Sequence, residues 1–285
     1  MDEGAIGFEA SRSEVPQLLW RDSAASTNTE LVKLAGDQQL PSFTTLVTTD
    51  QTAGRGRLDR AWIAPAESAI AISVLVRAEA PSGRPIGAAG FGWLPLAAGV
   101  AMSDAVGSVL PSGRRVGVKW PNDVQVDGRK VCGILSELVP PSAASPGVAV
   151  VIGAGLNVTM SQEQLPVPTA TSLVLAGADP GADPDAADGP ELFDRVLAAY
   201  LRSLTGLVTA LWRSDGDADR SGLRAAVVKR CSTIGHEVRA ELPGGAQLLG
   251  RAVGVDAVGR LEVRDSAGLV RAVAAGDIIH LRDDR

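Results

Sequence analysis

The sequence predicts an α+β fold, in which a mixed sheet packed with helices is followed by a small SH3-like β-barrel. Three observations support this prediction. Apolar residues recur at helical spacing over residues 191–213. The dipeptide Asp127-Gly128 is a strong hairpin signal between two apolar runs. After about residue 232, short alternating segments are separated by glycine-containing turns. We therefore expect a first domain over residues 1–231 and a second over residues 232–285.

Local patterns place the elements of the first domain in order along the chain. Thr27-Asn28-Thr29-Glu30 has the spacing of a capping box, which predicts a helix over about 28–37. Runs of β-branched and apolar residues predict strands, and one of these must end before Pro121. The expected strands are 43–49, 69–76, 115–120, 124–126, 131–139 and 148–153, and the further expected helices are 95–109, 191–213 and 221–231.

Other segments show no sign of regular structure. Residues 1–22 have no strong period, so no helix or strand is predicted there. Residues 140–147 and 177–190 are rich in small residues and proline, which predicts loops. The N-terminus has neither a basic start nor an apolar stretch, and no apolar run approaches the roughly 18 residues of a membrane helix. Neither a signal peptide nor a membrane span is therefore expected.

The composition is that of an ordinary globular protein. The chain has 285 residues, of which 45% are hydrophobic and 21% are charged. Its formal net charge of -6 disfavours non-specific binding to nucleic acid, because phosphate contacts depend on clustered Lys and Arg. Its two cysteines, Cys132 and Cys231, form no disulfide framework and fit a reducing cytoplasm. His236 and His280 lie in the tail, and the sequence shows neither a metal-ligand cluster nor a cysteine nucleophile paired with histidine.

A run between the first two expected strands combines glycine with arginine. It reads Gly54-Arg55-Gly56-Arg57-Leu58-Asp59-Arg60-Ala61-Trp62. The glycines permit close approach of the backbone to a ligand, and the guanidinium groups offer paired donors that match a carboxylate or a phosphate. Because three arginines gather on a net acidic chain, a small anionic ligand is favoured over a polyanion. No Walker loop is present in the sequence, so a nucleotide would bind with another geometry.

A second segment places polar groups at the end of an expected strand. It reads Lys119-Trp120-Pro121-Asn122-Asp123, and it is followed by Lys130 and Gly133-Ile134-Leu135. Such strand ends are common positions for catalytic groups. Gly153-Ala154-Gly155-Leu156-Asn157-Val158 follows a further strand, and its glycines would let the backbone approach a ligand. Ser26-Thr27-Asn28 is the expected helix N-cap, and a helix N-terminus also binds carboxylate or ureido groups.

Taken together, these motifs resemble those of biotin protein ligases, which are biotin–[acetyl-CoA-carboxylase] ligases. The order is Ser-Thr-Asn, Q-x-x-G-R-G-R-x-x-R-x-W, K-W-P-N-D, a lysine ahead of G-I-L, and G-x-G-x-N-V, over about residues 26–158. The resemblance implies that ATP with Mg²⁺ converts biotin to biotinyl-5′-AMP and pyrophosphate. A lysine of a biotin carboxyl carrier domain of an acetyl-CoA or acyl-CoA carboxylase then takes the biotinyl group. No tightly bound cofactor is implied.

The resemblance also assigns roles to individual residues. Charge develops on phosphate oxygens, so cations must be placed there in advance, and a loop must shield the reactive anhydride from water. The implied biotin-binding residues are Ser26, Thr27, Asn28, Gln51, Gly54, Arg55, Gly56, Arg57, Lys130 and Gly133. The implied ATP-binding residues are Arg57, Arg60, Trp62, Asn122, Lys130, Gly155 and Asn157. The implied catalytic residues are Arg55, Arg57, Lys119, Asp123 and Lys130, with Asp123 orienting or deprotonating the incoming lysine.

The chain departs from the family pattern at one position of the arginine run. Asp59 stands where the family usually has glycine, and its carboxylate adds negative charge beside Arg60 and the expected phosphate site. Only 25 residues precede Ser26, too few for the winged helix of relatives that repress transcription, so a ligase without repressor function is expected. The expected partner is the carrier domain, with no nucleic acid and no membrane. A monomer and a weak dimer both remain open, as does the role of the C-terminal barrel.

Two alternative functions fit the same fold. A lipoate ligase or lipoyl/octanoyl transferase would need a longer apolar channel, and both the arginine run and Lys119-Trp120-Pro121-Asn122-Asp123 argue against it. A non-enzymatic binder, such as a biotin sensor or an inactive adapter, would bind biotin without releasing pyrophosphate. Biotin and lipoate offered in parallel distinguish the first alternative, and pyrophosphate release distinguishes the second.

Overall fold

A computed structural model of the chain describes residues 8–57, 60–79, 86–142, 147–181, 189–242, 246–274 and 277–281. The elements in chain order are α1 (Glu9–Arg12), β1 (Leu18–Trp20), α2 (Thr27–Asp37), β2 (Thr45–Thr48), β3 (Gly54–Arg55), β4 (Ala61–Trp62), β5 (Ala69–Arg77), α3 (Ala88–Phe91), α4 (Leu94–Val109), β6 (Val116–Lys119), β7 (Asp123–Val126), β8 (Arg129–Val139), β9 (Ala149–Asn157), α5 (Gly189–Arg213), α6 (Leu223–Arg230), β10 (Glu237–Glu241), β11 (Gln247–Val255), β12 (Leu261–Arg264), β13 (Val270–Val273) and β14 (Asp277–His280).

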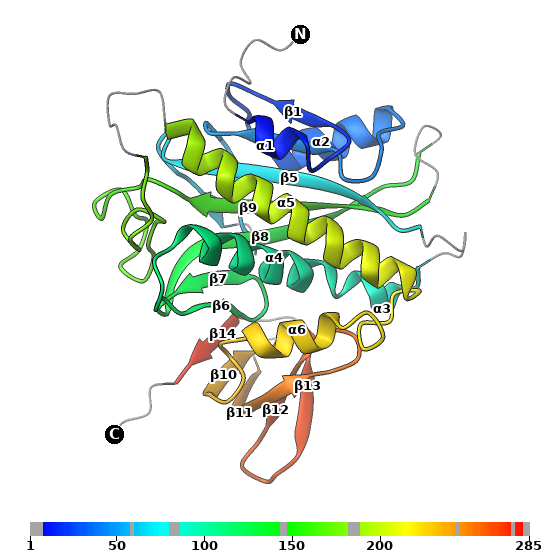
Figure 1. Cartoon of the computed structure of the whole chain (residues 1–285). Helices are drawn as coiled ribbons and strands as arrows, with labels where there is room; N and C mark the ends of the chain where they lie inside the picture. Colours follow the sequence, from blue (N-terminus) through cyan, green and yellow to red (C-terminus); the bar gives the residue numbers. More distant parts are fainter. Residues whose placement is uncertain are drawn as a thin grey trace.

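A seven-stranded sheet forms the body of the molecule, in the order β1-β2-β5-β9-β8-β7-β6. The pair β1–β2 is parallel and the other neighbours are antiparallel, so the sheet is mixed as predicted. The helices α4 and α5 run across one face (Figure 1). The helix α2 packs on the other face, against β5, β8 and β9. Each helix predicted for this region has a counterpart, and the hairpin at Asp127-Gly128 has positive φ at both residues.

The N-terminal part of the chain differs from the prediction. Residues 1–22 were assigned no element, yet α1 and the three-residue strand β1 form there, while residues 1–7 lie outside the described part. The strand β1 pairs with β2 from Leu18↔Thr45 to Trp20↔Val47. The carboxylate of Asp194 on α5 accepts hydrogen bonds from Ala10 N and Ser11 N, at 2.9 and 2.8 Å. These partners lie far away in the sequence, so local periodicity carries no sign of them.

The core lies between the sheet and the two long helices. Most residues of α4 are buried, including Leu94, Leu96 and Met102. The segment Ala89–Val109 is long and apolar enough to cross a membrane by length and hydropathy, which corrects the expectation that no apolar run reaches this length. Of the most apolar 18-residue stretch in this segment, 72% is buried inside the molecule. Its high hydropathy therefore reflects packing in the core.

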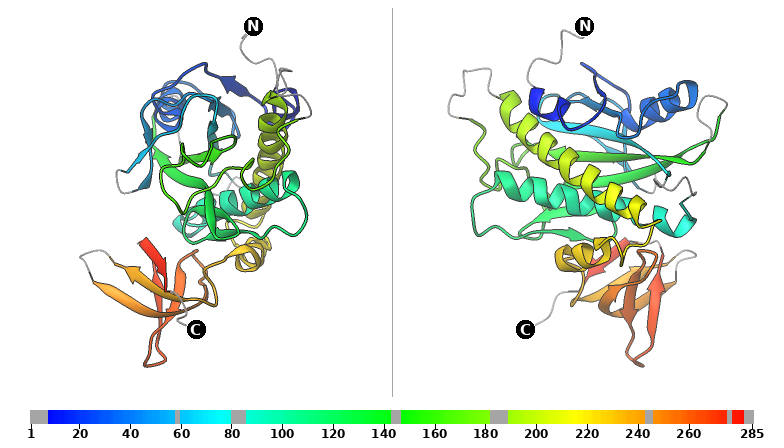
Figure 2. Two further views of the ribbon diagram at one scale, coloured as in Figure 1. Left: turned by 90° about the vertical axis from the view of Figure 1, so that its left-hand side faces the viewer. Right: turned by 45° about the vertical axis from the view of Figure 1, so that its right-hand side comes forward.

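A second sheet of five antiparallel strands follows, in the order β13-β12-β11-β10-β14. This confirms the predicted small C-terminal β unit, while the boundary at residue 231 stays a prediction. The unit lies at one end of the molecule (Figure 2), beyond the edge strand β6 (Figure 1). Ser232 N donates a hydrogen bond to Val118 O of β6 at 2.8 Å, so the chain entering this unit covers that edge. The loop predicted over 177–190 falls partly outside the described residues, and its last two residues begin α5.

Two tryptophan side chains of the larger unit donate hydrogen bonds to the C-terminal sheet. Trp93 Nε1 donates to Ala257 O and Trp120 Nε1 donates to Gly259 O, each at 3.1 Å. Both carbonyls belong to the turn between β11 and β12. The hydroxyl of Thr233, which is fully buried, accepts a hydrogen bond from Trp120 N at 3.0 Å. The segment that carries Trp120 is therefore held from the C-terminal side by neutral, buried hydrogen bonds.

Candidate active site

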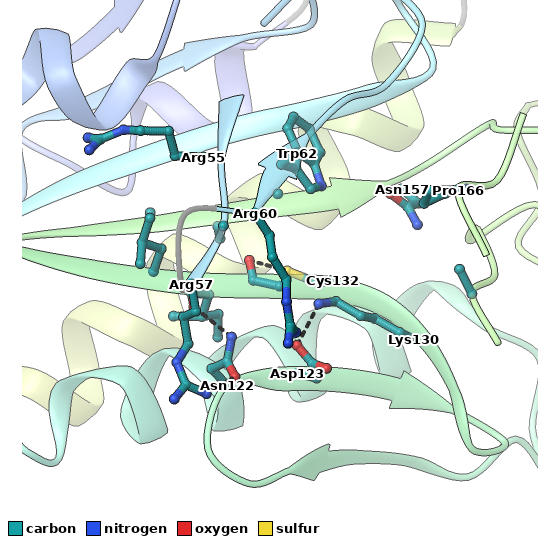
Figure 3. A pocket seen from close by; sticks show the side chains of 18 of the residues that line it. Arg55, Arg57, Arg60, Trp62, Asn122, Asp123, Lys130, Cys132, Asn157 and Pro166 are labelled. Atoms are coloured by element: carbon teal, nitrogen blue, oxygen red, sulfur yellow. Dashed lines mark hydrogen bonds and ion pairs between the residues drawn. The ribbon is translucent and has the colours of Figure 1, made fainter. Parts of the chain in front are cut away.

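A cavity of about 500 Å³ opens on the α2 face of the large sheet. The segments that the sequence singled out meet around it, as Figure 3 shows for Arg57, Trp62, Asn122, Lys130 and others. Every residue that the sequence assigned to the site lines this cavity, with the exception of Gly54. Segments separated by more than 100 residues in the chain are thus brought to one place.

Three glycines of β8 and β9 form part of the floor of the cavity. A methyl group at Gly153 would lie 2.3 Å from Asn28 Oδ1, and one at Gly155 would lie 2.6 Å from the Trp62 ring. A methyl group at Gly133 would lie 3.1 Å from Lys130 Nζ. Gly133 and Gly155 are paired across β8 and β9. Each glycine therefore makes room for one polar or aromatic side chain that projects over the sheet.

The N-terminus of α2 forms a polar wall at one end of the cavity. Gln51 Oε1 accepts a hydrogen bond from Thr27 N at 2.8 Å, and Asn28 Nδ2 donates to Leu135 O at 3.1 Å. Ser73 Oγ lies 2.8 Å from Thr27 Oγ1 and 2.6 Å from Asn28 Oδ1. Ser26 caps the helix by accepting from Thr29 N. These groups are held in place by hydrogen bonds to one another and to the sheet.

The arginine run folds into a small hairpin over the cavity. Its strands pair Gly54 with Trp62 and Arg55 with Ala61. A methyl group at Gly54 would lie 2.4 Å from Trp62 O, so this glycine serves the hairpin rather than the cavity lining. Gly56 N donates to Arg60 O at 2.6 Å. Asp59, the departure from the family pattern, lies outside the described residues.

The arginines of the hairpin point in different directions. Arg57 Nη1 donates to Asn122 Oδ1 at 3.0 Å. Arg60 points across the cavity toward Asp123, whereas Arg55 points away from Lys130 (Figure 3). The Arg55 guanidinium contacts Glu137 and Thr29 instead, so its predicted contact with biotin stays a prediction.

The Lys119–Asp123 segment brings its charged groups to the centre of the site. Lys130 Nζ lies 2.6 Å from Asp123 Oδ1, and both side chains are partly exposed. Asn122 Nδ2 donates to Ile134 O at 3.0 Å, which fixes this turn against β8. Lys119, at the end of β6, also lines the cavity. An anionic ligand would compete with Asp123 for the ammonium group of Lys130.

Asn157 marks the opposite end of the cavity from Asn28. It is buried at the end of β9, and its Nδ2 donates to Thr171 O at 3.0 Å. The neighbouring segment is tied to the site lysine, since Lys130 N donates to Thr169 O and Thr171 N donates to Lys130 O. The loop that includes Pro166 and Val167 is thereby held beside the site.

Burial shifts the pKa of two groups near the site. It raises the pKa of the Cys132 thiol to about 12, against a smaller opposing effect of Lys130. Burial lowers the pKa of His280 to about 4, and the charge of Lys119 and the nearby His236 act in the same direction. Both groups are therefore neutral at pH 7. In the described part of the chain, no group of three or more His, Cys, Asp or Glu residues is arranged to hold a metal ion.

Sequence reasoning missed several residues at the site. Ser73 lies in a strand whose apolar pattern gave no sign of a polar site. Glu241, Ile278 and Ile279 reach the cavity from the C-terminal sheet. Only the tertiary arrangement brings this sheet to the cavity, so no motif could have revealed these three residues.

Comparison with known proteins agrees with this geometry. The sequence model of the Biotin/lipoate A/B protein ligase family matches residues 20–157, and that of the Biotin protein ligase C terminal domain matches residues 233–281. The chain is 38% identical over 258 residues to a Biotin–[acetyl-CoA-carboxylase] ligase of Mycobacterium tuberculosis, covering 90% of this chain and 86% of that protein. The chain belongs to the biotin protein ligase family. This confirms the resemblance that the motifs indicated.

Two further relatives extend the comparison. A Biotin–[acetyl-CoA-carboxylase] ligase of Paracoccus denitrificans is 33% identical over 246 residues, covering 85% of this chain and 92% of that protein. The crystal structure of the biotin protein ligase from Aquifex aeolicus in complex with biotin and ATP has a TM-score of 0.66 and 24% identity, covering 94% of this chain and all of that one. That likeness shows that the biotin protein ligase fold is shared over nearly the whole chain.

Proposed function

We propose that the chain activates biotin with ATP and transfers it to a lysine of a biotin carboxyl carrier domain of an acetyl-CoA or acyl-CoA carboxylase. The observation that carries this proposal is the order of groups along the floor of the cavity. Asn28 projects over Gly153, Trp62 over Gly155, and Asn157 ends the same strand. Four residues of a strand span about 13 Å, which suits a small bicyclic head at one end and a nucleoside at the other.

The cationic group lies midway along this axis. Lys130 Nζ stands over Gly133, and Gly133 is the cross-strand partner of Gly155. A biotin carboxylate and the α-phosphate of ATP would therefore meet at this ammonium group. In the first step the carboxylate oxygen bonds to the α-phosphorus and pyrophosphate leaves. Lys130 stabilises the negative charge that develops on the phosphate oxygens, and the pre-placed charge costs no reorganisation.

The second step uses the mixed anhydride as an acyl donor. The lysine amine of the carrier bonds to the biotinyl carbonyl carbon, AMP leaves, and the amine loses a proton. Asp123 is the proposed acceptor or orienting group for this proton, because a ligand phosphate that binds Lys130 releases the Asp123 carboxylate from its ion pair. Arg57 and the hairpin would cover the anhydride and exclude water.

The remaining assignments follow from the same proposal. Trp62, Asn122, Gly155 and Asn157 would contact the nucleotide, and Arg60 its phosphates. Mg²⁺ would arrive as part of the ATP substrate complex. We place the reaction in the cytoplasm, where its substrates and a carboxylase carrier would be found. The absence of a repressor function stays a prediction.

The deciding experiment offers biotin and lipoate in parallel to the purified chain with ATP and Mg²⁺. Pyrophosphate release with biotin, followed by biotinylation of a carrier domain, supports the proposal. Release with lipoate alone would move the chain to the lipoate branch, which the matched family also includes. Binding of biotin with no pyrophosphate release, with or without carrier, would leave the chain a non-enzymatic binder.

A further inference from the structure

A row of three paired residues crosses the large sheet beneath the polar wall. Ser73 of β5 is the cross-strand partner of Gly153 of β9, and Gly153 is in turn the partner of Leu135 of β8. The Asn28 side chain lies over Gly153, where an added methyl group would come within 2.3 Å of its Oδ1. Asn28 Oδ1 lies 2.6 Å from Ser73 Oγ, and Asn28 Nδ2 donates to Leu135 O at 3.1 Å. The amide of Asn28 therefore spans the row from β5 to β8.

Ser73 also contacts the other polar side chain of the wall. Its Oγ lies 2.8 Å from Thr27 Oγ1, which in turn lies 3.1 Å from Gln51 Oε1. Gln51 Oε1 already accepts a hydrogen bond from Thr27 N at 2.8 Å. Ser73 is fully buried, and Thr27 and Asn28 are 3% and 6% exposed. Because these side chains are buried, each depends mainly on its neighbours for hydrogen bonds.

The protons of this network can be assigned by counting donors. The Asn28 group that faces the carbonyl of Leu135 must be its NH₂, so its oxygen faces Ser73. The single hydroxyl proton of Ser73 therefore goes to Asn28 Oδ1. At the 2.8 Å contact the proton must then come from Thr27, because two oxygen lone pairs at this distance would repel each other. The network thus runs one way, from the Thr27 hydroxyl through Ser73 to the amide of Asn28.

This direction decides what the wall offers to the cavity. Thr27 lines the cavity, whereas Ser73 lies behind it and has no exposed surface. With its proton directed at Ser73, Thr27 Oγ1 presents lone pairs to the cavity and can accept a hydrogen bond from a ligand. A site built to accept an N–H group rejects an analogue that lacks it, because the buried acceptor is then left unpaired. This end of the cavity therefore favours a ligand head that carries N–H groups.

We propose that Ser73 is a positioning residue, which fixes the proton direction of the polar wall and so sets its preference for an N–H donor. It acts through Thr27 and Asn28 rather than by contact with the ligand. The inference rests on the proposed function in one respect, namely that the bicyclic head of biotin, with its two ureido N–H groups, binds at this wall. It is independent of the chemistry at the phosphate.

Calorimetric titration of the purified full-length chain with biotin tests this role without turnover. Ser73→Ala removes both the donor to Asn28 and the acceptor of the Thr27 proton. We expect the Kd for biotin to rise about tenfold, which corresponds to the loss of one buried hydrogen bond. Ser103→Ala is the matched control, because it removes a similarly buried hydroxyl, bonded to Gly99 O, from α4 on the opposite face of the sheet. It should leave the Kd for biotin unchanged.

A second ligand tests the proton direction itself. In a cyclic-carbonate analogue of biotin, ring oxygens replace both ureido N–H groups. The wild type should bind this analogue far more weakly than biotin. In Ser73→Ala the Thr27 hydroxyl is free to turn its proton toward the cavity, so the ratio of the two Kd values should fall about fivefold. A loss of packing alone would weaken both ligands alike and leave the ratio unchanged.

A double-mutant cycle shows whether the effect passes through Thr27. In a Thr27→Val background, Ser73→Ala should weaken biotin binding by only about threefold. The same tenfold loss in both backgrounds, or an unchanged ratio of the two Kd values, would overturn the proposal.

The same titrations separate this inference from the proposed function. Wild-type binding of biotin by Ser73→Ala removes the role of Ser73 and leaves the proposed function standing. If the wild type binds no biotin, the proposed function fails, and the role of Ser73 toward this ligand fails with it.

Discussion

The two segments that carry most of the site chemistry are held in place by different kinds of contact. The arginine hairpin is attached through partly exposed charged groups, among them Arg55 and Glu137. The Lys119–Asp123 segment is attached through Trp120, whose side chain is 3% exposed, and through the fully buried Thr233. One segment is tied by contacts that water and salt weaken, and the other by contacts that water does not reach.

Because of this difference, we expect the arginine hairpin to be displaced more easily than the Lys119–Asp123 segment. An ion pair between partly exposed side chains contributes about 0–1 kcal/mol to stability, so a ligand can displace it. A buried hydrogen bond that loses one partner costs about 1–3 kcal/mol, because the remaining group stays without water. The buried contacts of Trp120 thus hold the segment that carries Asn122 and Asp123 in position. Substitutions at the Lys119–Asp123 segment and its contacts should change the adenylation rate or the stability. Substitutions in the hairpin should change the lifetime of bound adenylate.

The largest effect is expected at Lys130, which forms an ion pair with Asp123 of the Lys119–Asp123 segment. Lys130→Ala removes the charge that faces the reacting phosphate, and should raise the adenylation barrier by about 2–4 kcal/mol. Single-turnover pyrophosphate release measures this barrier. Lys33→Ala, an exposed lysine on α2, serves as the control. A rate for Lys130→Ala equal to that of the wild type would remove Lys130 from the reaction.

The next effect concerns the buried hydrogen bond that holds the Lys119–Asp123 segment. Thr233→Val keeps the shape of the side chain but leaves the buried Trp120 N–H without its acceptor. The free energy of unfolding should fall by about 1–3 kcal/mol, measured by denaturant titration. If stability is unchanged, the C-terminal unit does not hold this segment, and the contrast between the two sides loses its main support.

A smaller effect is expected for the arginine hairpin, at Arg57. Arg57→Ala removes the hydrogen bond to Asn122, which should shorten the lifetime of bound adenylate by about tenfold through loss of a charge-assisted contact. The rate of adenylation should change less than in Lys130→Ala. Release of preformed adenylate, followed by its hydrolysis in solution, gives the lifetime. An unchanged lifetime would mean that this attachment does not close the site.

The smallest expected effect is a change of stability with pH. It arises at His280 of the C-terminal sheet, which contacts Thr233. His280 Nε2 lies 3.1 Å from Thr233 Oγ1, and burial together with Lys119 and His236 lowers its pKa from 6.5 to about 4. Between these pH values the unfolded chain binds more protons than the folded chain. Stability should therefore fall as the pH falls from about 6.5 toward 4, and stay level above 6.5 as far as this group is concerned.

Unfolding titrations at several pH values measure this response. The variant His280→Gln, which cannot take up the proton, should show a weaker loss of stability over the same window. An equal pH dependence in the variant and the wild type would show that other groups govern the acid side.

The motif residues could be predicted because each motif combines local chemistry with a turn. Trp62, Asn122 and Lys130 were assigned to the site from such runs, and all three line one cavity. The helices α2 and α5 were predictable for a related reason, since a cap or a long apolar period defines each of them within one short window.

The features that escaped prediction depend on distant partners. The strand β1 is three residues long and forms only because β2 lies parallel to it. Glu137 is 82 positions from Arg55, and nothing near either residue marks the contact. Ile278 and Ile279 reach the site because the C-terminal sheet docks beside β6. The sequence thus revealed which residues do chemistry, while the contacts that position them needed the fold.

One lining residue has a consequence for the lifetime of the enzyme itself. An acyl-adenylate reacts with any thiolate within reach, and Cys132 lines the cavity between Lys130 and Gly133. Burial raises the pKa of this thiol to about 12, so the thiolate is disfavoured at pH 7. We therefore expect burial of this side chain to disfavour acylation of the protein's own cysteine. It also predicts that thiol-directed alkylating reagents leave the native site untouched.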